Sequence, residues 1–347
     1  MTEVTGIARG RINKPPRRHP HARFCCMQVK SAQPVRRITW KVFVDMITPG
    51  AVLLSAINPA LLGVIISLQQ EVSLSWPLTI FLLLIPALAN CSVNLLNDYY
   101  DFISGNDTAE NIVAEAEGPL VYHQVENPRP ALIYGLLFFA AACLMGIYVV
   151  IKCGPVPAAI GAFGALVTAT YSGRWVSTSH MPIGEVLSGI TMGGLIPLAV
   201  YVSLTGRLQD TPLILLRSLP MILVVSQFML ENNTCDMDRD YAAGRRTLPM
   251  FLGRARAKKL ADFLNIVWLT SLVLNVAVFF SFGLPVLAAS LYMGRKGIAG
   301  TFREERTRDN KLPATGALAS MAFWISEGYL ASSAVHLAVQ WLMIKLF

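Results

Sequence analysis

The chain has 347 residues, of which 54% are hydrophobic and only 14% are charged, and its mean hydropathy is +0.51. This composition excludes a single soluble domain of ordinary make-up and indicates an integral membrane protein. The formal net charge of +8 at pH 7 is interpreted as membrane topology plus attraction to anionic lipid, so nucleic-acid binding is not expected.

Residues 1–40 differ in composition from the rest of the chain. They contain many arginines, four prolines and few apolar side chains, which is typical neither of a secretory signal nor of a folded unit. We therefore predict a disordered basic cytoplasmic tail over 1–40 and one transmembrane domain over 41–347. The six cysteines form no Cys-x-x-Cys pair, so neither a disulfide nor a zinc site is expected.

Long apolar stretches follow the tail. They predict membrane-spanning helices over 41–68, 76–98, 131–152, 155–173, 183–204, 212–232, 258–281 and 318–344, with a shorter run at 282–294. All are much longer than a barrel strand of about 10 residues, and their apolarity is continuous rather than alternating. The expected fold is therefore all-α, a multi-pass transmembrane bundle of about nine helices.

The lysines and arginines predict how the bundle is oriented. Ten lie from Arg9 to Lys41, up to the start of the first span, seven lie from Arg239 to Lys259, and six lie from Arg295 to Lys311. Cytoplasmic loops retain such residues, so these three regions are expected on the cytoplasmic side. The N-terminus is then cytoplasmic, and the protein is predicted to lie in the cell membrane with its functional site facing the cytoplasm.

Two acid-rich segments lie where long apolar stretches end. One reads Asn-Asp-Tyr-Tyr-Asp from Asn97 to Asp101, and the other runs from Asn232 through Asp236 to Asp240. At 3.6 residues per turn, the four-residue steps within each segment place these side chains on one helix face if the helix continues. So many carboxylates are costly beside lipid unless a cation neutralises them. The segments therefore predict a divalent-metal site, and hard oxygen ligands favour Mg²⁺ held jointly with substrate phosphates.

Other residues near these segments are candidates for binding the substrate. Gly105 would let the chain turn so that Asp107 returns toward the first segment. Arg245 and Arg246 follow the second segment and could hold phosphate oxygens, although any cytoplasmic loop collects arginine. Tyr171 and Arg174 close the fourth span on the same side, where Tyr171 could equally belong to an interfacial aromatic belt.

Several further acidic residues are interpreted as structural. The glutamates from Glu110 to Glu126 lie in the long loop after the second span, and we expect them to be solvated. Glu185, near the start of the fifth span, is also expected to be solvated. The neighbouring glycines of that span are interpreted as a face for close helix packing.

With both acidic segments in place, the chain resembles the UbiA superfamily of intramembrane prenyltransferases over about residues 45 to 345. Members carry Asn-Asp-x-x-Asp after the second helix and Asp-x-x-x-Asp after the sixth, which match Asn97 to Asp101 and Asp236 to Asp240. The resemblance is greatest to the menaquinone-pathway branch, the 1,4-dihydroxy-2-naphthoate polyprenyltransferases. Residues 41–347 would then be a transmembrane prenyltransferase domain.

The resemblance implies both a ligand set and a reaction. Mg²⁺ would be held by Asn97, Asp98, Asp101, Asn232, Asp236 and Asp240, and catalysis would depend on the four aspartates of this set. The substrates would be a polyprenyl diphosphate and an aromatic acceptor. Loss of diphosphate gives an allylic cation, which Tyr99 or Tyr100 could stabilise. The naphthoate ring carbon would attack it, and loss of the ring carboxylate as carbon dioxide would give a demethylmenaquinol.

The sequence leaves alternatives open. The stretch from Lys41 to Gly50 lacks the Arg-Pro start common in the family, and Glu115 and Glu117 lie where relatives often have a glycine pair and a basic residue. Another aromatic acceptor, such as 4-hydroxybenzoate, homogentisate or a porphyrin, is therefore possible. A cation transporter also uses intramembrane carboxylates, but it would place them near the bilayer midplane between internal repeats. The Asp-Gly motif of a phosphatidyl-alcohol transferase is absent. Prenyl chain length and oligomeric state are not indicated.

Overall fold

The computed structural model describes residues 37–171 and 177–346. These residues form helices, turns and loops, with no β-strand among them, so the all-α prediction is confirmed. Residues 1–36 of the predicted tail, together with Arg174, lie outside the described residues.

Six helical segments of the described ranges are long and apolar enough to cross a membrane, by length and composition. They are Trp40–Leu68, Trp76–Ser104, Arg129–Cys153, Gly184–Thr205, Leu208–Cys235 and Arg254–Phe279. Four of them correspond largely to single helices, α4 (Trp76–Ser104), α6 (Arg129–Cys153), α10 (Thr211–Cys235) and α13 (Arg254–Phe279). The predicted total of about nine helices therefore remains a prediction, whereas the multi-pass character is confirmed.

The other two segments contain wide π-helical turns. The first consists of α1 (Trp40–Ile47), α2 (Pro49–Val52), the π-turn η1 (Leu53–Ile57) and α3 (Asn58–Leu68), and the other of α8 (Gly184–Ser188), the π-turn η4 (Gly189–Leu195) and α9 (Ile196–Thr205). Each π-turn lies just before a proline, Pro59 or Pro197. A proline lacks an N–H and crowds the carbonyl one turn earlier, and a wider turn relieves that crowding.

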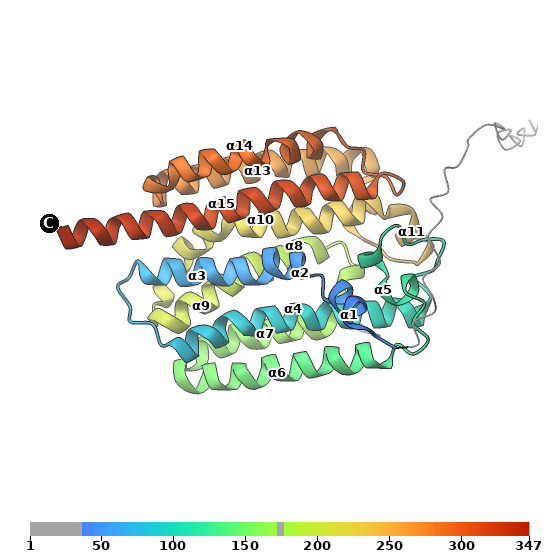
Figure 1. Cartoon of the computed structure of the whole chain (residues 1–347), viewed down its shortest axis with the longest axis horizontal. Helices are drawn as coiled ribbons and strands as arrows, with labels where there is room; N and C mark the ends of the chain where they lie inside the picture. The colour runs from blue at the N-terminus through green and yellow to red at the C-terminus, as the bar shows by residue number, and fades with distance from the viewer. Residues whose placement is uncertain (1–36, 172–176, 347) are drawn as a thin grey trace, which may run out of the picture.

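The bundle is completed by α7 (Pro155–Tyr171), α14 (Leu284–Arg303) and α15 (Lys311–Leu346). The helices run alongside one another, with α13, α14 and α15 on one side and α4, α6 and α7 on the other (Figure 1). Between them, α3, α9 and α10 supply much of the core, which includes the fully buried Trp268 and Tyr201. Gly193 lets η4 pack directly on α10, because a Cβ there would lie 2.3 Å from the Ile222 nitrogen.

Short elements gather at one end of the bundle, which we call the acidic end. They are η2 (Glu115–Glu117), α5 (Pro119–Tyr122), η3 (Thr178–His180), α11 (Met237–Ala242) and α12 (Leu248–Leu252), while η5 (Leu208–Asp210) and η6 (Ser281–Gly283) belong to other connections. Both α4 and α10 finish at the acidic end, where α5 and α11 lie (Figure 1). The tertiary fold thus brings together two motifs that are more than a hundred residues apart in the sequence.

Candidate functional site

The first acidic motif lies in the last turns of α4, which continues beyond the predicted end at residue 98 to Ser104. The helix therefore carries Asn97 and Asp101 on one face, as the four-residue spacing predicts, and Asn97 Nδ2 donates to Asp101 Oδ2 at 3.1 Å. Gly105 ends the helix with a left-handed φ of 72°, a conformation that glycine adopts without steric cost. The turn lets Asn106 Nδ2 donate to Asp101 Oδ1 at 3.0 Å.

The second acidic motif lies at the junction of α10 and α11. The Asp236 N–H donates to the Asn232 carbonyl at 2.9 Å, and the Asp240 N–H donates to the Asp236 carbonyl at 2.8 Å. Helical hydrogen bonding therefore continues through the junction, and the three motif residues keep their common face. Asp236 and Asp240 are both buried.

Arg245 connects the two motifs. Its Nη2 atom donates to Asp101 Oδ1 at 2.6 Å, and its Nη1 atom lies 3.7 Å from Asp240 Oδ1. The side chain of Arg245 is only 13% exposed, so the guanidinium lies between carboxylates in a largely desolvated position where charge pairing is strong. The structure thus brings Asp101 and Asp240 to the two terminal nitrogens of one cation.

A second group of cations joins the same site from the loop before α15 and from the first residue of that helix. Arg308 Nη1 donates to Asp236 Oδ1 at 2.6 Å, and Lys311 Nζ donates to Asp236 Oδ2 at 2.6 Å. Both cations also donate to Glu117, with Arg308 Nη2 2.8 Å from Glu117 Oε2. Arg239 lies close to Glu117 and to Asp107, with N to O distances of 3.6 and 3.5 Å.

Glu117 is therefore misassigned by sequence reasoning, which places it in a solvated loop. Its side chain is only 11% exposed, because Arg308 and Lys311, nearly two hundred residues later in the chain, enclose its carboxylate. Burial alone would raise the pKa of Glu117, but its bonds to Arg308 and Lys311 lower that pKa to about 2. The basic run from Arg295 to Lys311 could have indicated cationic partners for Glu117. Sequence reasoning instead attributes its charge to membrane topology alone.

Glu185 is also not solvated. It is only 2% exposed, and its Oε1 atom accepts hydrogen bonds from Asn233 Nδ2 at 2.8 Å and from the Leu248 N–H at 3.2 Å. The physical reason is that α8 packs against α10, which turns the carboxylate into the protein toward Asn233 and the first residue of α12. Glu185 thereby holds Asn233, the neighbour of Asn232 in the second motif, and the start of α12.

The other predicted site residues differ in their surroundings. Asp98 is buried at the acidic end, and its Oδ2 atom has no hydrogen-bond partner among the described residues. The Tyr171 hydroxyl lies 3.5 Å from the Met229 sulfur, on the side of α10 nearest α7. Arg246 is exposed beside Met250 and Phe251, and among the described residues its side chain forms no ion pair with a carboxylate.

The carboxylates of the site are crowded enough to affect their ionisation. Burial, followed by the charge of Asp101, raises the pKa of Asp107 to about 6. Burial also raises the pKa of Asp240 to about 6, although Arg245 opposes this shift. Burial and mutual repulsion disfavour the ionised forms of these carboxylates. A bound cation would therefore stabilise them.

Changing Glu117 to glutamine should destabilise the acidic end, because it leaves Arg308 and Lys311 with only Asp236 as a carboxylate partner. Loss of one member of a buried charge pair costs roughly 3 kcal/mol. Since the pKa of Glu117 is lowered from 4.5 to about 2, its contribution should be present above pH 4.5 and disappear as the pH falls toward 2. Thermal unfolding at pH 7 is the measurement, with the exposed Glu110→Gln as control; equal melting temperatures would contradict the role given to Glu117.

The fold and the site together define a multi-pass helical membrane protein with an oxygen-rich, cation-bridged site at one end of its bundle. Residues 56–338 match the UbiA prenyltransferase family. The chain belongs to this family, and the resemblance inferred from the two motifs is confirmed.

Individual relatives differ in how much of their length is matched. The chain is 31% identical to a 1,4-dihydroxy-2-naphthoate octaprenyltransferase of Bacillus subtilis over 207 residues, which are 57% of this chain and 65% of that protein. It is 25% identical to the UbiA prenyltransferase domain-containing protein 1 of Danio rerio over 236 residues, 67% of this chain and 68% of the relative. The chain thus spans about two thirds of the length of these relatives.

Solved structures share the fold at low sequence identity. A UbiA homologue from Archaeoglobus fulgidus bound to GPP and Mg²⁺ is 17% identical, with a TM-score of 0.55 over 84% of this chain and 99% of that one. A UbiA homologue from Aeropyrum pernix is 14% identical, with a TM-score of 0.56 over 79% and 95% of the two chains. At this level of identity the likeness concerns the helical arrangement alone.

Proposed function

We propose that the chain is a Mg²⁺-dependent prenyltransferase that moves a polyprenyl group from its diphosphate to 1,4-dihydroxy-2-naphthoate, with loss of carbon dioxide. The observation that carries the proposal is the meeting of the two acidic motifs, with Arg245 between Asp101 and Asp240. Family membership supports prenyl transfer, and the similarity to the Bacillus subtilis octaprenyltransferase supports the naphthoate acceptor.

The donor set fits a magnesium site. The residues that would hold the ion are Asn97, Asp98, Asp101, Asn232, Asp236 and Asp240, all of which offer the hard oxygen ligands that Mg²⁺ prefers. Asp98 Oδ2 is buried without a hydrogen-bond partner among the described residues, so it is a free acceptor for a cation. Bound Mg²⁺ would supply Lewis-acid stabilisation of the charge on a departing diphosphate.

The protein's own cations complete the case for a diphosphate. Arg245, Arg308 and Lys311 already donate to the motif carboxylates, so they stand where phosphate oxygens beside the ion would lie. Arginine binds such oxygens in a bidentate manner, while lysine adds a compact charge. We therefore assign these three residues to binding of the diphosphate group, and we assign Asp107, a carboxylate, to the same site through the bound cation.

Aromatic rings on α4 are available to the cation left behind when diphosphate departs. Tyr99 and Tyr100 follow Asp98 directly, and their rings pack edge to face with centroids 5.4 Å apart. A ring face attracts a nearby positive charge through its quadrupole. Burial of Asp98 and Asp101 beside these rings would limit access of water, which would otherwise capture an allylic cation.

The expected activity can be measured directly. Purified full-length protein with Mg²⁺, a polyprenyl diphosphate and 1,4-dihydroxy-2-naphthoate should yield prenylated product and one carbon dioxide per turnover. A panel containing 4-hydroxybenzoate and homogentisate tests the other acceptors. Prenylated product without released carbon dioxide would overturn the naphthoate assignment, and absence of product with every acceptor would overturn prenyl transfer itself.

We further propose that the protein lies in the cell membrane with its acidic end toward the cytoplasm. The basic segments from Arg239 to Lys259 and from Arg295 to Lys311 support this orientation, since cytoplasmic loops retain lysine and arginine. The position of the carboxylates at a bundle end also disfavours a cation transporter, whose site would lie near the midplane.

A further inference from the structure

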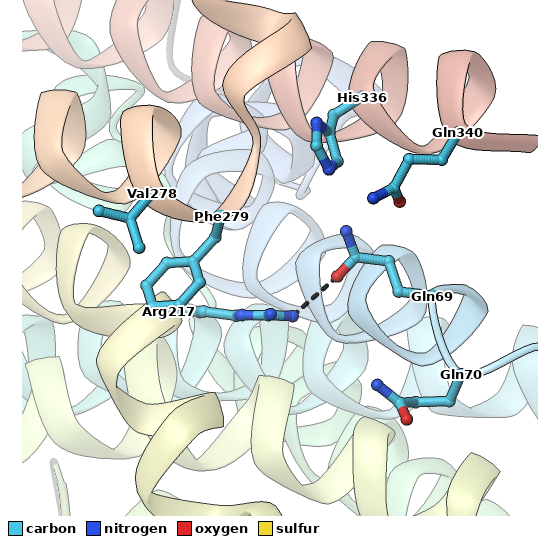
Figure 2. Close-up of a pocket in the computed structure, with 7 residues that line it drawn as sticks. All are labelled: Gln69, Gln70, Arg217, Val278, Phe279, His336 and Gln340. Atoms are coloured by element: carbon cyan, nitrogen blue, oxygen red, sulfur yellow. Dashed lines mark hydrogen bonds between the residues drawn. The ribbon is translucent and has the colours of Figure 1, made fainter. Parts of the chain in front are cut away.

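A polar cavity lies at the end of the bundle opposite the acidic end. It has a volume of about 350 Å³ and is lined by Gln69, Gln70, Arg217, Val278, Phe279, His336 and Gln340 (Figure 2). Arg217 lies near the start of α10, whereas Asp236 follows its last residue. At about 1.5 Å per helical residue the two are about 28 Å apart, close to the thickness of a bilayer's hydrocarbon core, about 30 Å. The cavity therefore lies at the level of the second membrane interface.

Arg217 is a cation without a carboxylate partner among the described residues. Its Nη1 atom donates to the neutral Gln69 Oε1 at 2.7 Å, and its guanidinium lies 4.7 Å from the centre of the Phe279 ring. Its Nε atom is buried without a hydrogen-bond partner in the described chain. A partly buried charge whose partners in the described chain are one amide and the ring faces of Phe279 and Phe280 is costly in a membrane protein. It marks a place where an anion would be stabilised.

The nearest acidic residue does not fill this role. Asp210, which precedes α10, accepts a hydrogen bond from the buried Tyr201 hydroxyl at 2.5 Å and does not line the cavity. Arg207 adds further positive charge nearby, since it donates to Gln70 Oε1. The cavity thus contains one arginine, three glutamine amides and one imidazole, with no carboxylate in its lining.

One nitrogen of the His336 imidazole already accepts a hydrogen bond from the protein. His336 Nδ1 accepts the Phe282 N–H at 3.3 Å, and its ring stacks on Phe282 at 5.2 Å. Figure 2 shows His336 and Gln340 on α15 facing Gln69 and Gln70 at the end of α3, with Arg217 and Phe279 beside them. Such a ring of neutral donors around one arginine suits a group with several oxygen acceptors and a single negative charge, as in a phosphodiester.

The surroundings distinguish a lipid from a small soluble anion. Val278 borders the cavity and is 68% exposed, and the adjoining Phe282 and Leu284 are 44% and 41% exposed. These apolar side chains lie on α13, on its connection η6 and at the start of α14, within or beside a spanning segment. A molecule with its phosphate in the cavity could therefore lay acyl chains along an apolar surface, which a free phosphate could not use.

We propose that this cavity binds the phosphate group of an anionic phospholipid in the membrane leaflet opposite the acidic end. Arg217 pairs with the phosphate oxygens, the glutamine amides and His336 surround the headgroup, and Val278 contacts the acyl region. The site is separate from the carboxylate motifs, so the proposal stands independently of the prenyl-transfer chemistry.

Native mass spectrometry of the detergent-purified full chain tests this site, with phosphatidylglycerol and phosphatidylcholine as competing probes. The unchanged protein should retain phosphatidylglycerol preferentially, and Arg217→Gln should lower its affinity at least tenfold. Lys152→Gln is the matched control, because Lys152 is an exposed cation near the same end of the bundle, at the end of α6. Equal binding by Arg217→Gln and unchanged protein would overturn the proposal.

A second variant and a competition experiment distinguish lipid binding from misfolding and from binding of a soluble phosphate. Gln340→Phe fills the cavity from α15 without removing the buried arginine, so it should weaken phosphatidylglycerol binding even if Arg217→Gln fails to fold. Inorganic phosphate and glycerol 3-phosphate test the soluble source: neither should displace the lipid at millimolar concentration. Displacement by either would identify a free phosphate site and refute the lipid assignment.

Discussion

Asp236→Asn should lower prenyl transfer at least about 100-fold, the usual scale for losing one group that stabilises developing charge. Asp236 is the central member of the second motif, and both of its oxygens accept bonds from cations, Arg308 and Lys311, at 2.6 Å. An asparagine offers one oxygen and no negative charge, so it weakens both the proposed metal site and the position of the two cations. Turnover under saturating Mg²⁺, and Mg²⁺ affinity by calorimetry, are the measurements.

Asp238→Asn is the matched control for this change. Asp238 lies two residues away on α11, but its side chain is 83% exposed and its ion pair within the described chain is with Arg254, at 3.0 Å. Exposed pairs of this kind contribute little, so this variant should keep near-normal activity and Mg²⁺ affinity. Similar losses in the two variants would show that the region tolerates no charge change at all, and full activity in Asp236→Asn would refute the metal role.

Arg245→Gln should raise the KM for the polyprenyl diphosphate and lower kcat together, with a combined loss of about 100-fold or more in kcat/KM. Among the described residues, Arg245 is the one that contacts carboxylates of both motifs, at 2.6 Å from Asp101 and 3.7 Å from Asp240. Its removal leaves these buried carboxylates with less positive charge and takes away a bidentate donor for the diphosphate. Steady-state kinetics with varied donor concentration measure the effect.

Arg246→Gln provides the neighbouring comparison. The Arg246 side chain is exposed beside Met250 and Phe251, and its backbone N–H donates to the His180 carbonyl at 2.9 Å. The variant should therefore change kcat/KM by less than about threefold, in keeping with a surface substitution. Equal losses in the two arginine variants would mean that the loop contributes through its total charge rather than through Arg245.

The two arginines illustrate how far sequence reasoning reaches at this site. Both follow the second motif and look equivalent in the sequence, and the distinction depends on which side chain turns toward Asp101 on a distant helix. Glu117 makes the same point in reverse. Its loop has no recognisable motif, and the cations that bury it, Arg308 and Lys311, belong to a segment whose charge is explained equally well by topology.

The sequence by itself determined the class of fold and the two motifs. Long continuous apolar runs can satisfy their backbone in lipid only as helices, and the four-residue spacing of Asn97 with Asp101 and of Asn232, Asp236 and Asp240 requires only local helical geometry. Such properties depend on neighbouring residues. They can therefore be predicted without knowing how the helices pack.

Only the tertiary structure decided which charges meet. Arg245 lies between the motifs, Glu117 is enclosed by Arg308 and Lys311, and Glu185 is turned inward against Asn233. The cavity around Arg217 likewise requires the ends of α3 and α13, the start of α10 and the C-terminal part of α15 to lie beside one another. The physical reason is that a charged side chain acts over a few ångströms in space, and helix packing rather than sequence separation sets those distances.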